Sequence, residues 1–269
     1  MTAHPSEIIP GVLFHTFLTN MRREKGGFLE KTALVLQVSG HFTLETAGQK
    51  ISMRRGEMLL MRKNQLGEIT KQPLEGEDYQ TILIHLNEEL LRTIALEENI
   101  EVNRKYGGPP NVLIPVNEFL RSFFDSIIPY VHHPKEKITT AMGMLKVREA
   151  VYLLINTLPE LKDFLFDFSE PHKIDLEKFM LSNFHYNIPI EKFARLTGRS
   201  LAGFKRDFQK IFGAAPRQWL QERRLTEARH LIEKRRKPSE IYLDLGFESL
   251  SHFSYSFKKK YGKAPSEWV

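Results

Sequence analysis

The chain has 269 residues, of which 41% are hydrophobic and 27% are charged, and its formal net charge is +6. This composition excludes a disordered or fibrous protein and allows one large or two ordinary globular domains. The absence of cysteine excludes disulfides, thiolate metal sites and thiol nucleophiles, and no run of about 18 apolar residues is present to span a bilayer. The N-terminal segment MTAHPSEIIPG lacks the basic and apolar regions of a secretion signal, so we expect a cytoplasmic protein.

Short apolar segments between residues 12 and 86 are typical of strands. They are VLFHTFLT, TALVLQVSG, HFTLETAG, QKISMR, EMLLMRKN and YQTILIHL, separated by turns that contain Gly. Segments of this length, partly alternating between apolar and polar residues, predict a small antiparallel barrel or sandwich. Over residues 116–131 and 137–158 the apolar spacing changes to three and four, which predicts two amphipathic helices. These helices are expected to cover the barrel, to pair with a second copy of the chain, or to do both with different faces.

Residues 159–173, PELKDFLFDFSEPHK, are predicted to link an N-terminal domain over residues 1–158 to a helical domain over residues 174–269. The linker contains several Phe and no Gly/Ser tract, so we expect it to be partly packed. Residues 172–269 hold 20 Lys and Arg against 11 Asp and Glu, a net charge of +9, whereas the first 171 residues hold 19 against 22, a net charge of −3. This segregation favours a C-terminal domain that binds a polyanion, although a solvated basic surface is the plain alternative.

A block of twenty residues occurs twice in the basic domain. SLAGFKRDFQKIFGAAPRQW, residues 200–219, is matched 49 residues later by SLSHFSYSFKKKYGKAPSEW, residues 249–268, with nine identities. The shared residues predict a scaffold, because a Ser N-cap, an apolar helix stripe and a Gly that ends the helix before Pro all recur. The predicted stripe is Leu201, Phe204, Phe208 and Ile211 in the first copy, and Leu250, Phe253, Phe257 and Lys260 in the second, where the last place has turned polar.

Each block follows a short helical segment, IPIEKFARL or KPSEIYLDL, and a tight turn that contains Gly. A helix, a tight turn and a second helix form the helix-turn-helix unit, whose second helix enters the DNA major groove. One such pattern is weak evidence, but two copies in register within a segment of net charge +9 make a strong prediction.

A long helix is predicted between the two units, over residues 216–237, PRQWLQERRLTEARHLIEKRRK. About 20 residues at 1.5 Å each span roughly 30 Å, which is close to one turn of B-DNA. The second helices of the two units are therefore expected to enter adjacent major grooves on one face of a duplex.

The positions that differ between the copies share one exposed helix face at spacings i, i+3, i+4 and i+7. They are Ala202, Lys205, Arg206 and Gln209 in the first copy, and Ser251, Ser254, Tyr255 and Lys258 in the second. We call these eight residues the base-contacting set, because a repeated scaffold with a changed outer face is expected if the two helices contact different bases. Ordinary drift of surface residues is the alternative. Arg206 is the best candidate for a bidentate bond to guanine.

Cations on and around the two blocks are predicted to contact DNA phosphates, although solvated charge is the alternative for each one taken alone. This phosphate-contacting set is Arg199, Lys210, Arg223, Arg224, Arg235, Arg236, Lys237, Lys259 and Lys260.

RRLTEARHLI in the predicted connecting helix and GFESLSHFSYSFKKKYGKAPSEW at the C-terminus resemble the AraC/XylS family of bacterial transcription regulators. The resemblance covers about residues 174–269. It implies a seven-helix domain with two helix-turn-helix units, usually in an activator that contacts RNA polymerase beside the promoter. Tyr242 stands where the family usually has Ala, and Leu245-Gly246 does not match Leu196-Thr197-Gly198 glycine for glycine, which affects local packing more than function. The implied partners are double-stranded DNA and RNA polymerase.

By architecture alone, the N-terminal part resembles the family's cupin-like barrel followed by two dimerisation helices. The expected fold class is therefore α+β, with an N-terminal cupin-like antiparallel β-barrel and two helices, and a C-terminal all-α domain with two helix-turn-helix units. A metal-binding cupin carries His-x-His, then Glu and a later His, whereas here His15, His41 and His85 stand apart and Gly67-Glu68 occupies the place of the later His. We expect no catalytic metal and no cofactor.

Enzyme hypotheses compete with the regulator. A cupin-type oxygenase or isomerase fused to DNA-binding helices would need the missing metal ligands, and a repair methyltransferase with this helical module would need a nucleophilic Cys. We therefore expect no catalysis. Within the regulator hypothesis, the N-terminal domain responds either to a small effector in its barrel or to a regulatory protein, with or without forming a homodimer, and the residues do not separate these alternatives.

Overall fold

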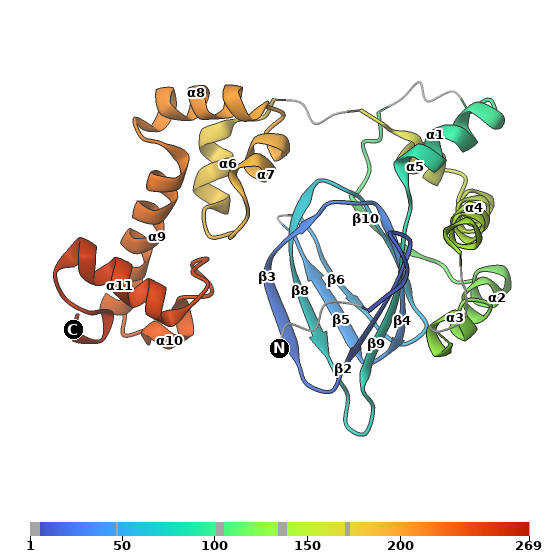
Figure 1. The fold of residues 1–269 in the computed structure, drawn as a ribbon, viewed down its shortest axis with the longest axis horizontal. Coiled ribbons are helices and arrows are strands. Elements are labelled where there is room, and N and C mark those ends of the chain that lie inside the picture. The colour runs from blue at the N-terminus through green and yellow to red at the C-terminus, as the bar shows by residue number, and fades with distance from the viewer. Residues whose placement is uncertain (1–5, 47, 101–104, 134–138, 170–172, 269) are drawn as a thin grey trace. The chain divides into compact units, whose positions relative to one another are not determined.

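The protein is described here by a computed structural model, which places residues 6–46, 48–100, 105–133, 139–169 and 173–268. The chain forms two compact units, an N-terminal unit of strands and helices and a C-terminal unit of helices (Figure 1). The predicted α+β fold class is confirmed. Among the described residues, none of the helices combines the length and the apolar composition that a membrane span requires.

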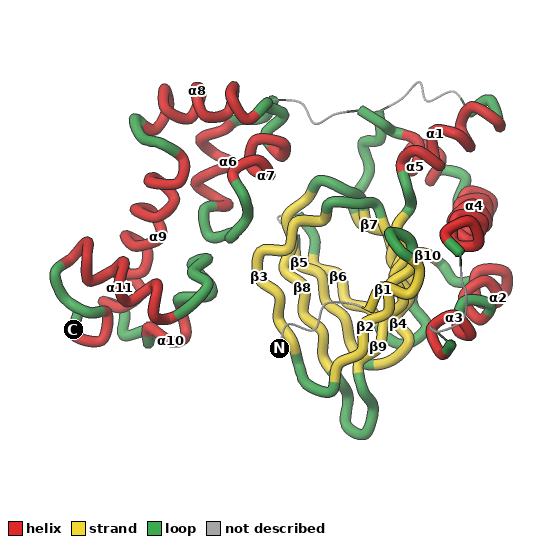
Figure 2. The backbone as a smooth tube through the Cα atoms, in the orientation of Figure 1, coloured by secondary structure: helices red, strands yellow, loops and turns green. Residues whose placement is uncertain are grey.

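Two β-sheets form the centre of the N-terminal unit (Figure 2). Their strands are β1 (Ser6–Ile9), β2 (Leu13–Leu18), β3 (Arg22–Leu29), β4 (Ala33–Ser39), β5 (His41–Glu45), β6 (Lys50–Met53), β7 (Met58–Met61), β8 (Gln65–Gln72), β9 (Tyr79–His85) and β10 (Asn111–Ile114). One sheet has the order β1-β2-β9-β4-β7-β10 and the other has the order β3-β8-β5-β6. Pairing is antiparallel throughout the first sheet, as predicted. The strands β1, β3, β8 and β10 lie outside the predicted segments.

Strands β4 and β7 are apolar almost throughout because both of their faces are buried. Val35 of β4 packs with Phe42 and Tyr79 in a cluster that includes residues of both sheets. The next residue back along the strand, Leu34, belongs to a second cluster on the opposite face, together with Leu60 of β7. Successive side chains of a strand point to opposite faces, so β4 and β7 contribute to a hydrophobic core on each face of the sheet rather than to one core and one solvent-exposed face.

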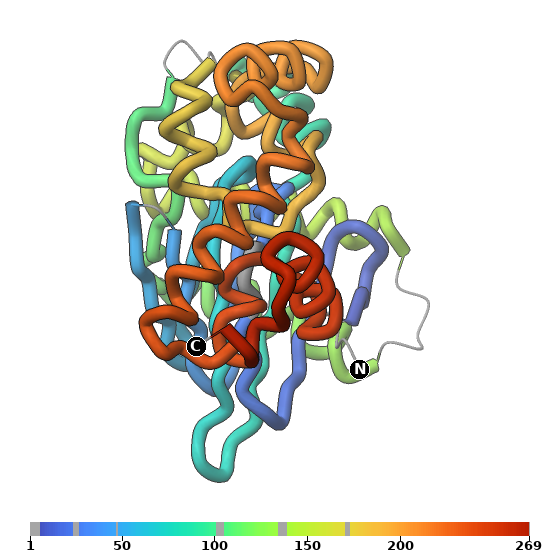
Figure 3. Tube along the Cα trace, turned by 90° about the vertical axis from the view of Figure 1, so that its left-hand side faces the viewer, coloured from blue at the N-terminus to red at the C-terminus, as the bar shows by residue number. Residues whose placement is uncertain are grey.

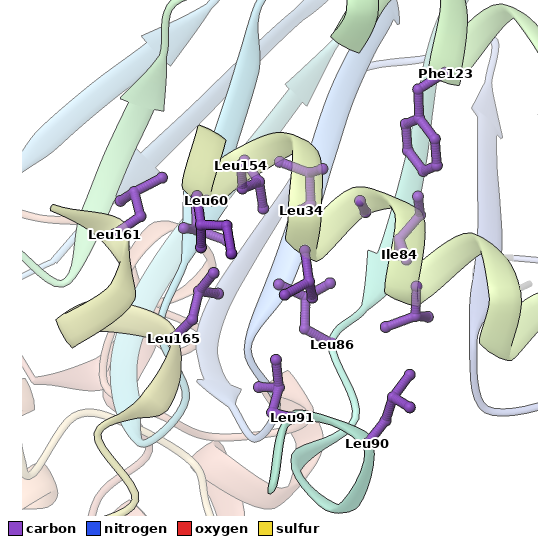
Figure 4. Packing of buried hydrophobic residues seen from close by; sticks show 14 of the residues in the cluster. Leu34, Leu60, Ile84, Leu86, Leu90, Leu91, Phe123, Leu154, Leu161 and Leu165 are labelled. Carbon is purple, nitrogen blue, oxygen red and sulfur yellow. The ribbon is translucent and has the colours of Figure 1, made fainter. Parts of the chain in front are cut away.

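Helices cover the second face of the six-stranded sheet. They are α1 (Glu88–Glu97), α2 (Glu118–Asp125), α3 (Ile128–His132), α4 (Thr140–Thr157) and α5 (Leu161–Phe166). Leu154 of α4 and Leu161 and Leu165 of α5 lie around Leu34 and Leu60 of the sheet (Figure 4). Each fully buried Leu stabilises the fold by about 1.5–3 kcal/mol relative to an exposed one.

The helix predicted over residues 116–131 is interrupted. Helix α2 ends at Asp125, and α3 starts at Ile128 with Pro129 in its first turn. Proline has no N–H to donate to the carbonyl of Asp125, so α2 cannot continue through it. Phe119, which has the apolar spacing of the predicted helix, is 72% exposed.

The segment predicted as a linker begins with α5, whose apolar residues are buried in the N-terminal core. Asp167 follows α5 and accepts hydrogen bonds from the Arg62 side chain and from the backbone N–H groups of Tyr106, at 3.1 Å, and Ser169, at 3.0 Å. Burial alone would raise the pKa of Asp167, but the hydrogen bonds from Ser169 and Arg62 outweigh it and lower the pKa to about 2. The chain is therefore packed as far as Phe168, and linker residues 170–172 lie outside the described residues.

The C-terminal unit is helical. Its helices are α6 (Leu176–Asn183), α7 (Ile190–Leu196), α8 (Leu201–Phe212), α9 (Pro216–Glu233), α10 (Pro238–Ile241), α11 (Leu250–Tyr261) and the 3-10 helix η1 (Pro265–Glu267). Within this unit α9 runs from α8 to α11 (Figure 3). Phe204 and Phe208 of α8 and Phe253 and Phe257 of α11 are fully buried in one core.

The connecting helix α9 is shorter than the prediction, which carried it through residue 237. It ends at Glu233, and Arg235 has a left-handed φ of 62°. The N–H of Arg235 donates to the carbonyl of Ile232, and that of Arg236 donates to the carbonyl of Leu231. Lys237 precedes Pro238, and a residue before proline disfavours the helical conformation. The cations from Arg235 to Lys237 therefore lie in a turn rather than on a helix.

Candidate nucleic-acid interface

The first helix-turn-helix unit consists of α7, a turn and α8. The Ser200 hydroxyl accepts a hydrogen bond from the N–H of Gly203 at 3.2 Å, which caps α8 as predicted. Gly213 ends the helix with a left-handed φ of 68°, a conformation that costs glycine no steric strain. Local signals of this kind allowed both ends of α8 to be predicted.

The second unit consists of α10, a turn and α11, and its caps are the same. The Ser249 hydroxyl accepts from the N–H of His252 at 3.2 Å, and Gly262 ends α11 with a φ of 80°. The turns of the two units differ. The left-handed glycine is Gly198, two residues before its serine cap, in the first unit, and Gly246, three residues before its cap, in the second. The second helices of the two units, α8 and α11, which we call the recognition helices, are therefore more similar than the turns that precede them.

An aromatic cluster supports each recognition helix. The ring centroids of Phe208 and Trp219 are 5.6 Å apart, and those of Phe257 and Trp268 are also 5.6 Å apart. A further aromatic residue packs against both rings in each copy, namely Phe212 in the first and Tyr261 in the second. The aromatic residues preserved in the repeat therefore form an equivalent packed cluster in each copy.

Three positions of the predicted stripe do not belong to the core, and the first of them is Leu250, which is 39% exposed. Ile211 is 43% exposed, because Phe212 fills the place beside Phe208. Lys260 is exposed, and its ammonium donates to the Glu222 carbonyl of α9 at 3.1 Å. Spacing alone misassigned Ile211 and Leu250, whereas the last place of the second stripe is already polar in the sequence.

The base-contacting set lies almost entirely on the surface. Seven of its eight residues are exposed and Ser254 is half-buried. The Arg206 side chain is 80% exposed, and its Nε atom lies 3.7 Å from Asp207 Oδ1. Tyr255 of the second helix is 69% exposed. The two recognition helices therefore present four-residue faces of different chemistry on similar scaffolds.

Most of the phosphate-contacting set is also accessible. The exposed members are Lys210, Arg235, Arg236, Lys237, Lys259 and Lys260. Arg235 to Lys237 line a groove of about 1020 Å³ together with Lys263. Arg223 is half-buried. Its Nη1 atom lies 3.5 Å from Glu227 Oε2, and its Cζ atom lies 4.8 Å from the centroid of the Phe184 ring.

Arg199 has a structural position that does not suit a phosphate contact. Its side chain is 10% exposed, and Nε donates to Asp207 Oδ2 at 3.1 Å. Its Nη1 atom donates to the carbonyls of Ile174 and Thr197. Because its donors are used inside the protein, we remove Arg199 from the phosphate-contacting set.

Arg224 is likewise unsuited to a phosphate contact. Its guanidinium donates to three backbone carbonyls, at 2.8 Å to Phe184 and Tyr186 and at 3.1 Å to Gly246. Burial lowers the pKa of Arg224 to about 10. The group keeps its charge at neutral pH, but it is turned into the protein, so we remove it from the set as well.

Arg217 is a candidate that the sequence analysis missed. It is exposed in the first turn of α9 and lines a groove of about 450 Å³ with Lys205 and Gln209 of the base-contacting set. Its partner in the repeat is Ser266, so this position also changes between the copies. This change of residue type between the copies is the signal in the sequence that identifies Arg217.

The N-terminal histidines lie on different strands. His15 is on β2, His41 on β5 and His85 on β9, where its ring packs on Phe14 with centroids 4.6 Å apart. Burial, together with the nearby charge of Lys31, lowers the pKa of His85 to about 4. Among the described residues, no three His, Asp or Glu side chains come together to hold a metal ion.

Two capped helix-turn-helix units on one shared core, joined by a helix in a basic domain, define the architecture of a helix-turn-helix DNA-binding protein. A helix-turn-helix domain family matches residues 193–269, and the family of the ExsA N-terminal regulatory domain matches residues 32–166. The chain belongs to the AraC/XylS family of transcription regulators and carries an ExsA-type N-terminal regulatory domain. The resemblance drawn from the C-terminal motifs is therefore confirmed.

Three named relatives and one solved structure are similar to this chain. The thermoregulatory protein LcrF of Yersinia pestis is 24% identical over 212 residues, which are 74% of each chain. The HTH-type transcriptional regulator ExsA of Pseudomonas aeruginosa is 25% identical over 226 residues, 81% of this chain and 75% of its own. The virulence regulon transcriptional activator VirF of Yersinia enterocolitica is 40% identical over 57 residues, 21% of each chain. The solved structure of ToxT from Vibrio cholerae is 16% identical over 95% of this chain and 96% of its own, with a TM-score of 0.44.

Proposed function

We propose that the chain activates transcription by binding promoter DNA with α8 and α11 in two adjacent major grooves. The observation that carries this proposal is the pair of recognition helices with one scaffold and two different exposed faces. A shared scaffold fits the same groove geometry twice, and different side chains contact different bases. The relative named as a transcriptional activator supports the direction of the effect.

The length of α9 supports the two-groove arrangement. Its 18 residues span about 27 Å at 1.5 Å each, and α8 and α11 lie near its opposite ends (Figure 1). Successive major grooves on one face of B-DNA are about 34 Å apart. With the width of the recognition helices added, the C-terminal unit is long enough to place one helix in each groove.

The proposed contacts follow from accessibility. Bases are contacted by the base-contacting set, with Arg206 in the first groove and Tyr255 in the second as its most prominent members. Phosphates are contacted by the exposed cations of the phosphate-contacting set, by Arg223, and by Arg217. Phosphate contacts fix the position of the protein, and base contacts select the sequence.

The N-terminal unit is proposed to control this binding without catalysis. Phe119 of α2 and Leu145 of α4 are large apolar side chains that are 72% and 67% exposed, which supports pairing of these helices in a homodimer. The signal is a small effector or a regulatory protein, and the downstream partner is RNA polymerase in the cytoplasm.

The test is the substitution of Arg206. A specific duplex is first selected from a random pool with the wild-type protein, and binding of Arg206→Ala is compared on this duplex and on random DNA. We expect a loss of about 1–3 kcal/mol on the selected duplex and little change on random DNA. Arg206→Lys keeps the charge but not the bidentate geometry, so it should lose most of the specificity as well. Equal losses on both kinds of DNA would contradict a base contact.

A further inference from the structure

One arginine of α9 joins the two helix-turn-helix units. Two of the carbonyls that accept from Arg224 belong to Phe184 and Tyr186, in the segment that leads from α6 into α7 of the first unit. The third belongs to Gly246, in the turn of the second unit. The planar guanidinium thus holds backbone from both units at once.

The backbone around Gly246 leaves room for no other residue. Gly246 has a φ of 81°, in the left-handed region. A Cβ atom at this position would overlap the carbonyl oxygen of His185 and lie 3.0 Å from Cζ of Arg224. The turn of the second unit is therefore in close contact with the segment before α7, and the guanidinium of Arg224 bridges the two.

A second hydrogen bond crosses between the units beside this bridge. Asn187 Nδ2 donates to Glu248 Oε1 at 3.2 Å. In the repeat Glu248 corresponds to Arg199, which forms an ion pair with Asp207 inside its own unit. In the second unit the place of Asp207 is taken by the buried Ser256, so Glu248 bonds to the first unit instead.

We propose that Arg224 is a positioning residue that sets the distance and rotation between α8 and α11, and thereby the spacing between half-sites that the regulator accepts. The inference rests on the proposed function, because it assumes that both helices contact DNA. Lysine carries a single ammonium on a longer, flexible stem and cannot reproduce the planar fork that meets three carbonyls. Arg224→Lys should therefore keep the charge and loosen the bridge.

The experiment uses the full chain and a duplex selected from a random pool by the wild-type protein. Variants of this duplex carry one or two base pairs inserted or deleted between the two half-sites, and a further duplex carries one half-site alone. We expect wild-type binding to fall by about tenfold or more when the spacing changes, because contacts in one groove are lost. For Arg224→Lys and Arg224→Gln the difference between spacings should shrink to about threefold or less, with unchanged binding to the single half-site.

Arg223→Gln is the matched control. Arg223 is the neighbour of Arg224 and stacks over Phe184, but its ion-pair partner is Glu227 in its own helix. Its loss should weaken all spacings alike, as expected of a phosphate contact. Asn187→Ala, which removes only the second hydrogen bond, should reduce the spacing preference to a smaller degree.

The outcomes separate this inference from the proposed function. If the wild-type protein selects no duplex, the proposed function fails. If it selects one and Arg224→Lys, folded as judged by circular dichroism, keeps the wild-type spacing profile or weakens every spacing equally, the positioning role is overturned. Asn187→Ala supplies a second test of the same contact should the Arg224 variants fail to fold.

Discussion

The two helix-turn-helix units show which parts of a repeated structure are fixed by packing and which are free to change. Both have a serine N-cap, a glycine C-cap and a buried aromatic cluster, and they differ on the exposed faces of α8 and α11. They also differ in the polar interactions that hold each unit in place. The first unit has an internal Arg199–Asp207 ion pair, whereas the second is tied to the first through Glu248 and Gly246. The second unit therefore depends on the first for its position.

The largest expected effect tests whether the scaffold is equivalent in both units. Phe204→Ala and Phe253→Ala each remove a fully buried ring, so each should lower the free energy of unfolding by about 3–5 kcal/mol. Both tryptophans of the chain, Trp219 and Trp268, lie in the C-terminal unit, so tryptophan fluorescence during urea denaturation reports on it directly.

The control for these variants is Ile211→Ala. Ile211 has the spacing of the apolar stripe but is 43% exposed, and we expect its loss to cost less than about 1 kcal/mol. A small effect of one Phe variant beside a large effect of the other would show that the two cores are not equivalent.

The next largest effect is expected from removing the interactions that hold each unit in place. Arg199→Ala removes the donor to the Asp207 carboxylate and to the carbonyls of Ile174 and Thr197, although the Thr197 carbonyl still accepts from the N–H of Ile174. It should destabilise the C-terminal unit by about 1–3 kcal/mol. Glu248→Ala, at the matching position of the second unit, removes one exposed hydrogen bond and should cost less than about 1 kcal/mol. The measurement is again urea denaturation. Equal losses of unfolding free energy would refute the distinction between an ion pair within the first unit and a hydrogen bond between the units.

The smallest effect is a pH dependence that arises from Asp207 in the first unit. The hydrogen bond from Arg199 lowers the pKa of Asp207 below its ordinary value of 3.8. A carboxyl with a lowered pKa in the folded state stabilises the fold at pH values above 3.8, and this contribution is lost as the pH falls through the folded-state pKa. Titration of the Asp207 carboxyl by NMR should show a midpoint below 3.8, and Arg199→Ala should raise it. A midpoint that does not move in this variant would contradict the assigned cause.

Local signals made the recognition helices predictable from the sequence. The residues whose partners lie far away along the chain could not be predicted. Ser200, Gly213 and their partners in the repeat act on backbone within a few residues, so both ends of each helix follow from the sequence. The roles of Arg199 and Arg224 could not be predicted in this way, because the carbonyls that they bond are up to 40 residues away and carry no side-chain signal. Charge alone placed both residues on the DNA side.

The N-terminal unit shows the same limit. Strand β7 is apolar throughout and β4 almost throughout, and both were predicted. Strands β3 and β8 contain Gly and charged residues that hide the strand pattern. Helix α1 was missed although its signal is local, since the Asn87 side chain caps it by accepting from the N–H groups of Glu89 and Leu90. The break before α3 was likewise marked by Pro129.

The most direct test of the central claim is a methylation-protection footprint of guanine N7 atoms on a duplex selected by the wild-type protein. Two recognition helices in adjacent major grooves should protect two groups of guanines about 10 base pairs apart on one face of the duplex. Arg206→Ala should abolish protection in one group and Tyr255→Ala should weaken it in the other. A single protected group, or loss of the same group in both variants, would contradict the assignment of one helix to each groove.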